Sequence, residues 1–347
     1  MRFIKNGNIF GSHRVISPKG VLPQPAEKIN HDVDVLWDNE ILIDVDTLNI
    51  DSASFAQIKT ISKNDKTTIK NNIINIVNSR GKLHNPVTGS GGMLIGKIEL
   101  IGSKIEKTCD LKIGDLIATL VSLSLTPLKI YEILDINLQT CQVKIKGKAV
   151  LFESSCYTKL PDDIPAPLAL AILDVCGAPA QTKRIVKPGD TVVILGAGGK
   201  SGILCSHEAR KKTGKKGTVI GIESVKNIDL NSLNIYNHIL NIDACNALLC
   251  FETISKITDN KLADVVINCV NVADTELSSV LICKERGTVY FFSMATSFTK
   301  AALGAEGMGK DIDMLIGNGY AKGHAKLALN IVRQSYDIRK IFSSPYL

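Results

Sequence analysis

A glycine-rich turn in the middle of the chain separates a short apolar run from a segment with a helical pattern. Gly196 and Gly198 are one residue apart, and Gly199, Lys200 and Ser201 follow directly. In such a turn the first glycine allows a tight reversal, and the second lets the backbone approach a ligand closely. Amides at the start of the next helix hold anions, phosphate above all. The spacing therefore predicts binding of a dinucleotide through its pyrophosphate.

The third position of this motif departs mildly from the usual pattern. Ser201 stands there, with Gly202 one residue later, and a small residue still permits close packing of helix against strand. A kinase-type phosphate loop fits poorly, because it needs a glycine five residues before Lys200, where the chain has Leu195. The remaining alternative is a glycine-rich turn that binds nothing.

An acidic residue is expected to follow the second strand of such a site and to hold the ribose hydroxyls. Glu223 directly follows the apolar run 218–222 and lies 27 residues after Gly196, more than the usual spacing of about 20. A carboxylate repels a 2′-phosphate, so Glu223 favours NAD over NADP. Ser224 and Lys226 could instead serve that phosphate, which keeps NADP as the alternative.

The second half of the chain alternates apolar runs with helical patterns, which is typical of a parallel sheet covered on both faces. We predict a Rossmann-type, doubly wound α/β domain over residues 166–320, in which 224–262 lack a clear periodicity. The predicted strands are 191–195, 218–222, 263–269, 288–292 and 314–316, and the predicted helices are 200–212 and 275–284. Asn271, Ser293 and Met294 follow two of these strands, so we expect them near the nicotinamide.

The first half is rich in predicted strands, with glycine and proline between them. One helix is predicted over 66–79 from isoleucine and valine at helical spacing. A chain of 347 residues exceeds one compact core, so we predict a β-rich substrate domain over 1–165 that regains 321–347. The predicted strands are 41–45, 92–100, 116–123 and 143–152.

The composition argues against several classes of protein. The net charge of +7 comes from 41 basic and 34 acidic residues that are interleaved along the chain, a pattern typical of a solvated surface rather than of nucleic-acid binding. No apolar run approaches the roughly 20 residues of a membrane span. Nine scattered cysteines without a Cys-x-x-Cys pair indicate reduced thiols and a cytoplasmic protein. We expect a homodimer or a larger homo-oligomer.

Residues 187–199, together with the β-rich first half, resemble the medium-chain dehydrogenase/reductase superfamily, whose N-terminal domain has a GroES-like fold. A closer resemblance is carried by six further segments: 11–16, 19–26, 44–55, 84–93, 122–128 and 291–300. These segments resemble the L-erythro-3,5-diaminohexanoate dehydrogenase family, and the resemblance runs nearly end to end. It implies NAD(P)-dependent oxidative deamination of (3S,5S)-3,5-diaminohexanoate to 5-amino-3-oxohexanoate in anaerobic lysine degradation.

Medium-chain alcohol dehydrogenases hold a catalytic zinc with a cysteine, a Gly-His-Glu segment and a later cysteine or aspartate. The corresponding segments here, 49–51 and 88–92, contain neither cysteine nor histidine. A catalytic zinc needs three protein ligands, and His84 and Cys176 are only loose possibilities. We therefore predict that no metal is bound.

Without zinc, a side chain must activate the amine, because an alkylammonium, with a pKa of about 10, must lose its proton before hydride can leave. His84, Asp51, Glu153 and Asp174 are the candidate bases. His84 precedes the glycine-rich loop 86–92, and its ordinary pKa suits the task. Each candidate also has an ordinary structural alternative, such as a helix cap or a surface acid.

The substrate carboxylate needs a cationic partner, for which Arg14, Lys19 and Lys300 are candidates. We expect the active site in a cleft between the two domains. Two other functions stay open: a zinc-free reductase of quinones or enones, and a non-catalytic dinucleotide-binding protein.

Overall fold

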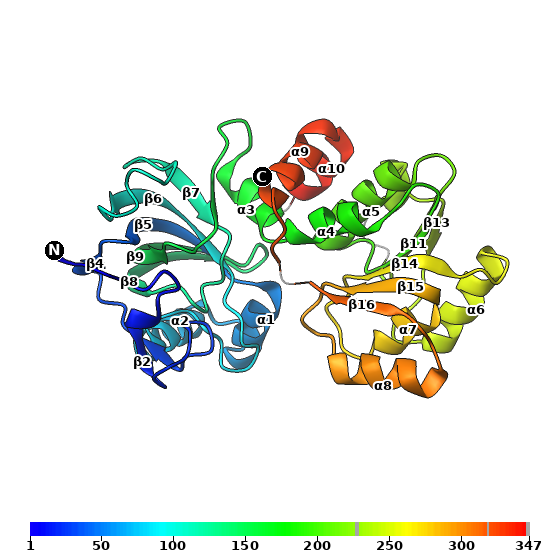
Figure 1. Ribbon diagram of the computed structural model, residues 1–347, viewed down its shortest axis with the longest axis horizontal. Helices are drawn as coiled ribbons and strands as arrows, with labels where there is room; N and C mark the ends of the chain where they lie inside the picture. The colour runs from blue at the N-terminus through cyan, green and yellow to red at the C-terminus, as the bar shows by residue number, and fades with distance from the viewer. Residues whose placement is uncertain (226–228, 318, 345–347) are drawn as a thin grey trace. The chain divides into compact units, whose positions relative to one another are not determined.

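The computed structural model describes residues 1–225, 229–317 and 319–344. The chain divides into two compact units, Met1–Asp174 and a second that begins at Val175. Each unit has its own six-stranded sheet and its own hydrophobic core. Figure 1 shows the chain with many of its helices and strands labelled.

The first unit is built on an antiparallel sheet with the strand order β10-β7-β6-β5-β9-β8. Its central strand β5 alternates: Ile41 and Ile43 pack in the main core, and Leu42 packs in a smaller cluster, as the two faces of a strand require. The elements are β1 (Arg2–Ile4), η1 (Ser12–Arg14), β2 (Val15–Ser17), β3 (Lys28–Ile29), β4 (Val35–Trp37), β5 (Glu40–Asn49), α1 (Ser52–Ile61), α2 (Lys66–Arg80), β6 (Met93–Ile101), β7 (Leu116–Thr119), β8 (Leu128–Asn137), β9 (Gln142–Phe152), β10 (Tyr157–Lys159) and α3 (Ala166–Leu173).

Helix α2 confirms the helix predicted over 66–79. Its buried residues Ile69, Ile73 and Val77 are spaced four apart, so that they form one apolar stripe against the core. The Asp65 side chain accepts the Thr68 N–H at 2.6 Å, which caps the amino end, and Gly81 ends the helix in the left-handed conformation. Helix α1 was not predicted.

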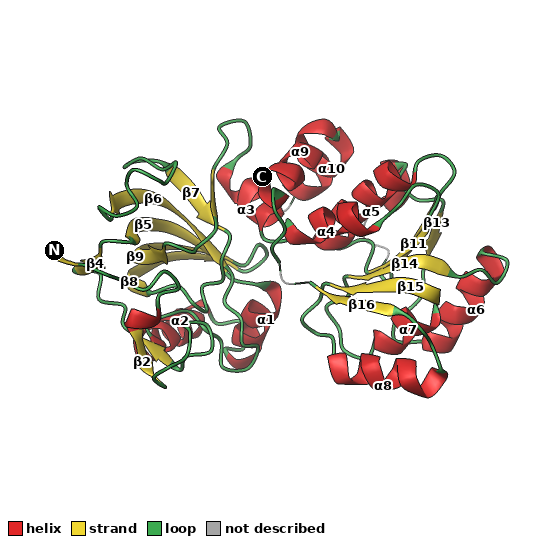
Figure 2. Cartoon of the chain, in the orientation of Figure 1, coloured by secondary structure: helices red, strands yellow, loops and turns green. Residues whose placement is uncertain are grey.

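The second unit is built on a parallel sheet with the strand order β13-β12-β11-β14-β15-β16. Helices α4, α5 and α9 lie on one face and α6, α7 and α8 on the other (Figure 2). Helix α9 packs against α4 and α5. The elements are α4 (Gly177–Ile185), β11 (Thr191–Leu195), α5 (Lys200–Thr213), β12 (Thr218–Ile222), η2 (Leu230–Leu233), β13 (His238–Leu240), α6 (Ala247–Ile257), β14 (Ala263–Asn268), α7 (Glu276–Leu281), β15 (Cys283–Phe291), α8 (Phe298–Met308), β16 (Asp313–Ile316), α9 (His324–Gln334) and α10 (Tyr336–Ser343).

The fold class is confirmed: a doubly wound parallel sheet accompanies a β-rich N-terminal unit. Two predicted elements need correction. The helix predicted over 275–284 ends at Leu281, because Cys283 already begins the buried strand β15. The strand predicted over 116–123 ends at Thr119, and β8 was missed. Among the described residues, no helix is long and apolar enough to cross a bilayer.

Candidate functional site

The glycine-rich turn connects β11 to α5. Gly196 has φ = 76°, in the left-handed region that glycine adopts without strain. A Cβ added to Gly202 would lie 2.0 Å from the Gly196 carbonyl oxygen. Gly202 therefore fulfils the packing role that the sequence suggested for Ser201, since only a residue without a side chain lets α5 approach the turn.

Helix α5 presents its amino end at this turn. Gly199 is its N-cap residue and no side chain caps the helix, whose first-turn amides have no acceptor within the helix itself. Gly199 is exposed, and Lys200 and Ser201 are half-buried in the first turn. The partial positive charge of the helix end favours an anion here.

The Glu223 carboxylate is bonded directly to the glycine-rich turn. Its Oε2 accepts the Gly198 N–H at 2.8 Å, and its Oε1 accepts the Val225 N–H at 3.2 Å. The Asn241 side chain donates to the carbonyl oxygens of Glu223 and Ser224. These contacts hold the carboxylate toward the turn. Lys226, the other residue suggested for a 2′-phosphate, lies outside the described residues.

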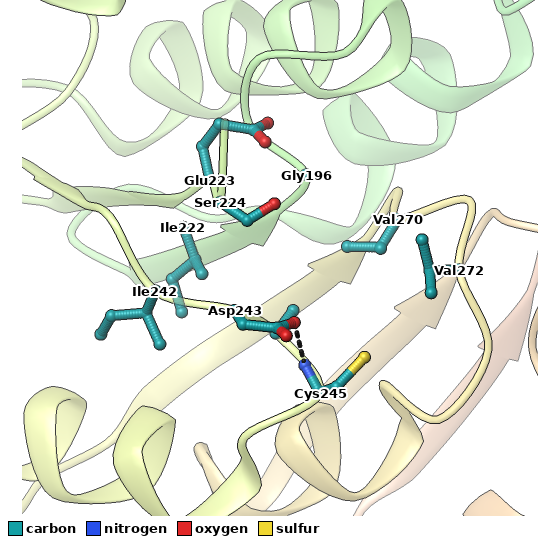
Figure 3. Close-up of a pocket in the computed structure, with 10 residues that line it drawn as sticks. Gly196, Ile222, Glu223, Ser224, Ile242, Asp243, Cys245, Val270 and Val272 are labelled. Carbon is teal, nitrogen blue, oxygen red and sulfur yellow. Dashed lines mark hydrogen bonds between the residues drawn. The ribbon is translucent and has the colours of Figure 1, made fainter. Parts of the chain in front are cut away.

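A pocket opens beside Gly196, at the carboxyl ends of β11, β12, β13 and β14 (Figure 3). Ligands bind at this edge of an open α/β sheet. Asp243 and Cys245 come from the stretch 224–262, where the sequence shows no clear periodicity, so they were not predicted. The pocket is lined by Gly196, Ile222, Glu223, Ser224, Ile242, Asp243, Ala244, Cys245, Val270 and Val272.

Two loops follow β14 and β15 and contain Asn271, Ser293 and Met294. Asn271 and Met294 are exposed, whereas Ser293 is buried and its Oγ accepts the Ala295 N–H at 3.1 Å. All three follow the carboxyl ends of their strands, at one edge of the sheet.

A buried polar network anchors these loops. The Asn268 side chain, at the end of β14, donates to Thr275 Oγ1 at 2.8 Å and to Ser279 Oγ at 2.9 Å. Glu276 is 1% exposed and its Oε1 accepts the Ser297 N–H at 2.6 Å. The network was missed, because the sequence placed residue 268 inside a strand and residue 276 on an ordinary helix. The available signal was an amide side chain, Asn268, at the end of an apolar run, and an acid, Glu276, at the start of the helix that follows.

Asp51 and His84 lie in the first unit, and each has a buried polar atom with no hydrogen-bond partner among the described residues: Oδ2 of Asp51 and Nδ1 of His84. Asp51 Oδ1 accepts the Ser54 N–H at 2.9 Å and caps α1. Burial, followed by the charges of Lys82 and Arg80, lowers the pKa of His84 to about 4. Unpaired buried polar atoms are costly, so these two atoms retain unused hydrogen-bonding capacity.

Close packing joins the segments that carry Asp51 and His84. A Cβ on Gly92 would lie 2.8 Å from the Asp51 backbone nitrogen. The Ser54 and Thr88 hydroxyls are 2.5 Å apart. The Asn85 side chain accepts the Val87 N–H at 2.8 Å, which orders the loop after His84. The structure thus brings the start of α1 and the glycine-rich loop together.

Glu153 is placed away from this cluster. It follows β9, whose pairing sets Phe152 opposite Glu40 and sets Gln142 opposite Asn49, so Glu153 and Asp51 lie at opposite ends of the strand pair. An ion pair with Lys104, 3.0 Å long, lowers the pKa of Glu153. Asp174 is half-buried directly after α3.

The described residues contain no group of three His, Cys, Asp or Glu side chains that could hold a metal ion. Cys176 is buried at the amino end of α4, and no disulfide joins cysteines within the described residues. The absence of a bound metal stays a prediction.

The basic residues suggested for the substrate carboxylate have other partners. Arg14 is fully buried, and its guanidinium donates five hydrogen bonds to Glu40 and to three backbone carbonyls. This leaves it no donor for a substrate, which corrects the hypothesis for Arg14. Lys19 donates to the Val15 carbonyl, and Lys300 pairs with Asp274.

Residues 13–161 match the family model described as the L-erythro-3,5-diaminohexanoate dehydrogenase N-terminal domain. A protein of Acetoanaerobium sticklandii with the name L-erythro-3,5-diaminohexanoate dehydrogenase is 56% identical over 340 residues, 97% of this chain and 98% of that protein. A protein of Fusobacterium nucleatum with the same name is 53% identical over 346 residues, 99% of this chain and 100% of that protein.

Solved structures share the fold at low identity. The CurK enoyl reductase has a TM-score of 0.53 at 18% identity and covers 87% of this chain and 77% of its own. A mycobacterial protein in complex with NADPH has a TM-score of 0.52 at 15% identity, with 88% and 81% covered. The quinone oxidoreductase of Coxiella burnetii has a TM-score of 0.54 at 15% identity, with 89% and 88% covered.

Proposed function

The chain belongs to the L-erythro-3,5-diaminohexanoate dehydrogenase family, and from this premise we propose that it oxidises (3S,5S)-3,5-diaminohexanoate with NAD in lysine degradation. The ammonium form of the substrate, NAD⁺ and water give 5-amino-3-oxohexanoate, NADH, ammonium and one proton. The second unit holds the dinucleotide, and the first unit supplies the groups that handle the amine.

The position of Glu223 carries the choice of NAD. Its carboxylate is held by the Gly198 and Val225 amides and lines the same pocket as Asp243. Two carboxylates in one pocket oppose a 2′-phosphate, whereas Glu223 can accept hydrogen bonds from ribose hydroxyls. The pyrophosphate lies against the turn from Gly196 to Ser201, where the amino end of α5 offers its amides.

The nicotinamide end lies toward the loops with Asn271, Ser293 and Met294. The network of Asn268 and Glu276 beneath these loops fixes their positions, which supports a site that must hold one face of a ring toward the substrate. When bound, the nicotinamide supplies the hydride acceptor.

Asp51 and His84 handle the amine. The pKa of His84, about 4, keeps the imidazole neutral near pH 7, so its unpartnered Nδ1 can accept an N–H from the amine or from the attacking water. The free Oδ2 of Asp51 offsets the positive charge that develops as the carbon loses hydride. We assign Glu153 a structural role, because its carboxylate is bonded to Lys104 and Asn39, and Asp174 stays a secondary candidate.

We propose that the reaction uses no metal and that the protein is a cytoplasmic homodimer. The outer edge of β16 has no partner strand in the described part of the chain, and the apolar side chain of Ile316 in this strand is exposed. An unpaired edge with an exposed apolar side chain favours association with a second copy. Light scattering after gel filtration measures the mass.

The decisive test is turnover by the purified protein. NADH formation from 3,5-diaminohexanoate, followed by absorbance, is expected together with one ammonium ion per NADH. Reduction of a quinone or an enone by NADH, without turnover of the diamino acid, would overturn the proposal in favour of a reductase. Binding of NADH without turnover of either substrate class would indicate a protein that only binds the dinucleotide.

A further inference from the structure

The wall of the pocket opposite Glu223 is formed by residues 242–245, which follow β13 (Figure 3). Apolar side chains make up much of the remaining lining: Ile222, Ile242, Ala244, Val270 and Val272. Such a lining suits the faces of an aromatic ring rather than a sugar or a phosphate. Because Glu223 lies where the adenosine ribose is proposed, the ring beside it is the base of the dinucleotide.

Asp243 is the polar group of this wall. One carboxylate oxygen accepts the Cys245 N–H at 2.9 Å, whereas the Cys245 thiol donates to the Ala273 carbonyl oxygen at 3.4 Å. The contact with the Cys245 amide holds the Asp243 side chain at the pocket. A carboxylate has about four acceptor positions, so Asp243 can accept further hydrogen bonds, and no lysine or arginine within the described ranges forms an ion pair with it.

An ionised carboxylate only accepts hydrogen bonds, so the base at its side must offer a donor. The exocyclic amino group of adenine offers two N–H groups. Hypoxanthine carries a carbonyl oxygen at that position, which would face the negative carboxylate, and its N1–H donor lies one ring atom away. Such a site discriminates between the two bases in two ways: the carboxylate gains a hydrogen bond from adenine, and it repels the carbonyl oxygen of hypoxanthine.

We propose that Asp243 is a specificity-determining residue that recognises the adenine amino group of the dinucleotide. The inference rests on the proposed binding of NAD beside Glu223. It adds that the base, and not only the ribose and pyrophosphate, is selected by a side chain of this pocket.

The test compares NADH with its hypoxanthine analogue, deamino-NADH, by fluorescence titration of the full-length protein. Wild-type protein is expected to bind NADH about tenfold more tightly, the value of one charge-assisted hydrogen bond. Asp243→Asn keeps the shape but adds an N–H donor, so the NADH affinity should fall and the deamino-NADH affinity should rise. Glu252→Gln, an exposed acid on the neighbouring helix α6, controls for the loss of one charge and should leave the ratio unchanged.

Equal affinities of the wild type for the two dinucleotides would overturn the inference, and this measurement needs no variant. An unchanged ratio in Asp243→Asn, with both dinucleotides bound, would also overturn it and would leave the proposed function intact. If the wild type bound neither dinucleotide, the proposed function would fail first, and the inference with it.

Discussion

The two carboxylates at the pocket of the second unit, Glu223 and Asp243, have hydrogen-bond partners within the protein. In the first unit, Asp51 and His84 each have one buried polar atom without such a partner in the described part of the chain. Glu223 is bonded to the Gly198 amide and Asp243 to the Cys245 amide. Asp51 Oδ2 and His84 Nδ1 are buried without a partner among the described residues. One site is arranged in advance by the protein itself, and the other leaves hydrogen-bonding capacity to be satisfied by a ligand.

This difference suits two different tasks. Holding a large anionic cofactor requires groups fixed in place before it binds, because ordering them afterwards reduces affinity. Handling a proton requires an atom that can accept it, and an acceptor already bonded to the protein is less available. We therefore expect changes in the second unit to affect binding and changes at Asp51 and His84 to affect the rate.

The largest effect is expected from Gly198→Val. An added Cβ at Gly198 would lie 2.9 Å from Glu223 Oε2, and the branched side chain would also occupy the space that the pyrophosphate needs. NADH affinity should fall by about a hundredfold or more in a fluorescence titration. Gly307→Val is the control, since a Cβ on Gly307 meets nothing within 4 Å. Unchanged NADH affinity in Gly198→Val would remove the basis for the dinucleotide site.

Replacing His84 by Ala should lower kcat by about a hundredfold, the usual contribution of one acid–base group. The NADH dissociation constant should not change, because His84 belongs to the unit assigned to the amine. His238→Ala, at an exposed position of β13, serves as a control for loss of a histidine. Steady-state kinetics with the diamino acid measures kcat. A normal kcat in His84→Ala would reassign the base to Asp51 or Asp174.

Glu223→Ser should reduce the preference for NAD over NADP by about tenfold, because it removes a negative charge beside the expected 2′-phosphate. The ratio of kcat/KM for the two cofactors measures it. Glu223→Gln retains the size of the side chain and separates charge from shape. A wild-type preference for NADP would contradict the assignment of Glu223 and leave the dinucleotide fold untouched.

A smaller effect concerns stability in acid. Burial lowers the pKa of His84 from 6.5 to about 4, so the folded state favours the neutral ring. The resulting stabilisation is fully present above pH 6.5 and is lost as the pH falls through 4. The free energy of unfolding of the wild type should therefore decrease relative to His84→Gln over this range in urea titrations. Parallel curves for the two proteins would contradict the lowered pKa.

No effect is expected from chelation. Activity should survive prolonged treatment with EDTA, because segments 49–51 and 88–92 supply neither cysteine nor histidine. Activity measured before and after treatment, with metal content determined in parallel, tests this. Loss of activity that stoichiometric zinc restores would show that these segments had been misinterpreted.

The sequence predicted best where a local pattern is enough. The turn from Gly196 to Ser201 and the strands 191–195 and 218–222 match the structure, because buried parallel strands and the start of α5 each have a short, characteristic pattern. Helix α2 was predicted for the same reason.

The missed elements are held by contacts with other parts of the fold rather than by a clear periodicity of their own. Helix α1 has mixed polarity and is fixed by the Asp51 cap and by packing against α2, which its own sequence does not reveal. Strand β13 is only three residues long and pairs with β12 through Ile220 and His238. This pairing places Asp243, three residues after β13, at the pocket. Because β13 could not be recognised in the sequence, the position of Asp243 could not be predicted either.

The anchoring of the loop 292–297 limits how this enzyme can be altered. The loop begins where β15 ends, and its far end, Ser297, is held by Glu276 and caps α8 through Lys300. With both ends fixed, an inserted or deleted residue would have to break one of these attachments. Engineering a new substrate range here should therefore proceed by exchanging side chains such as Met294, which is exposed, at constant loop length.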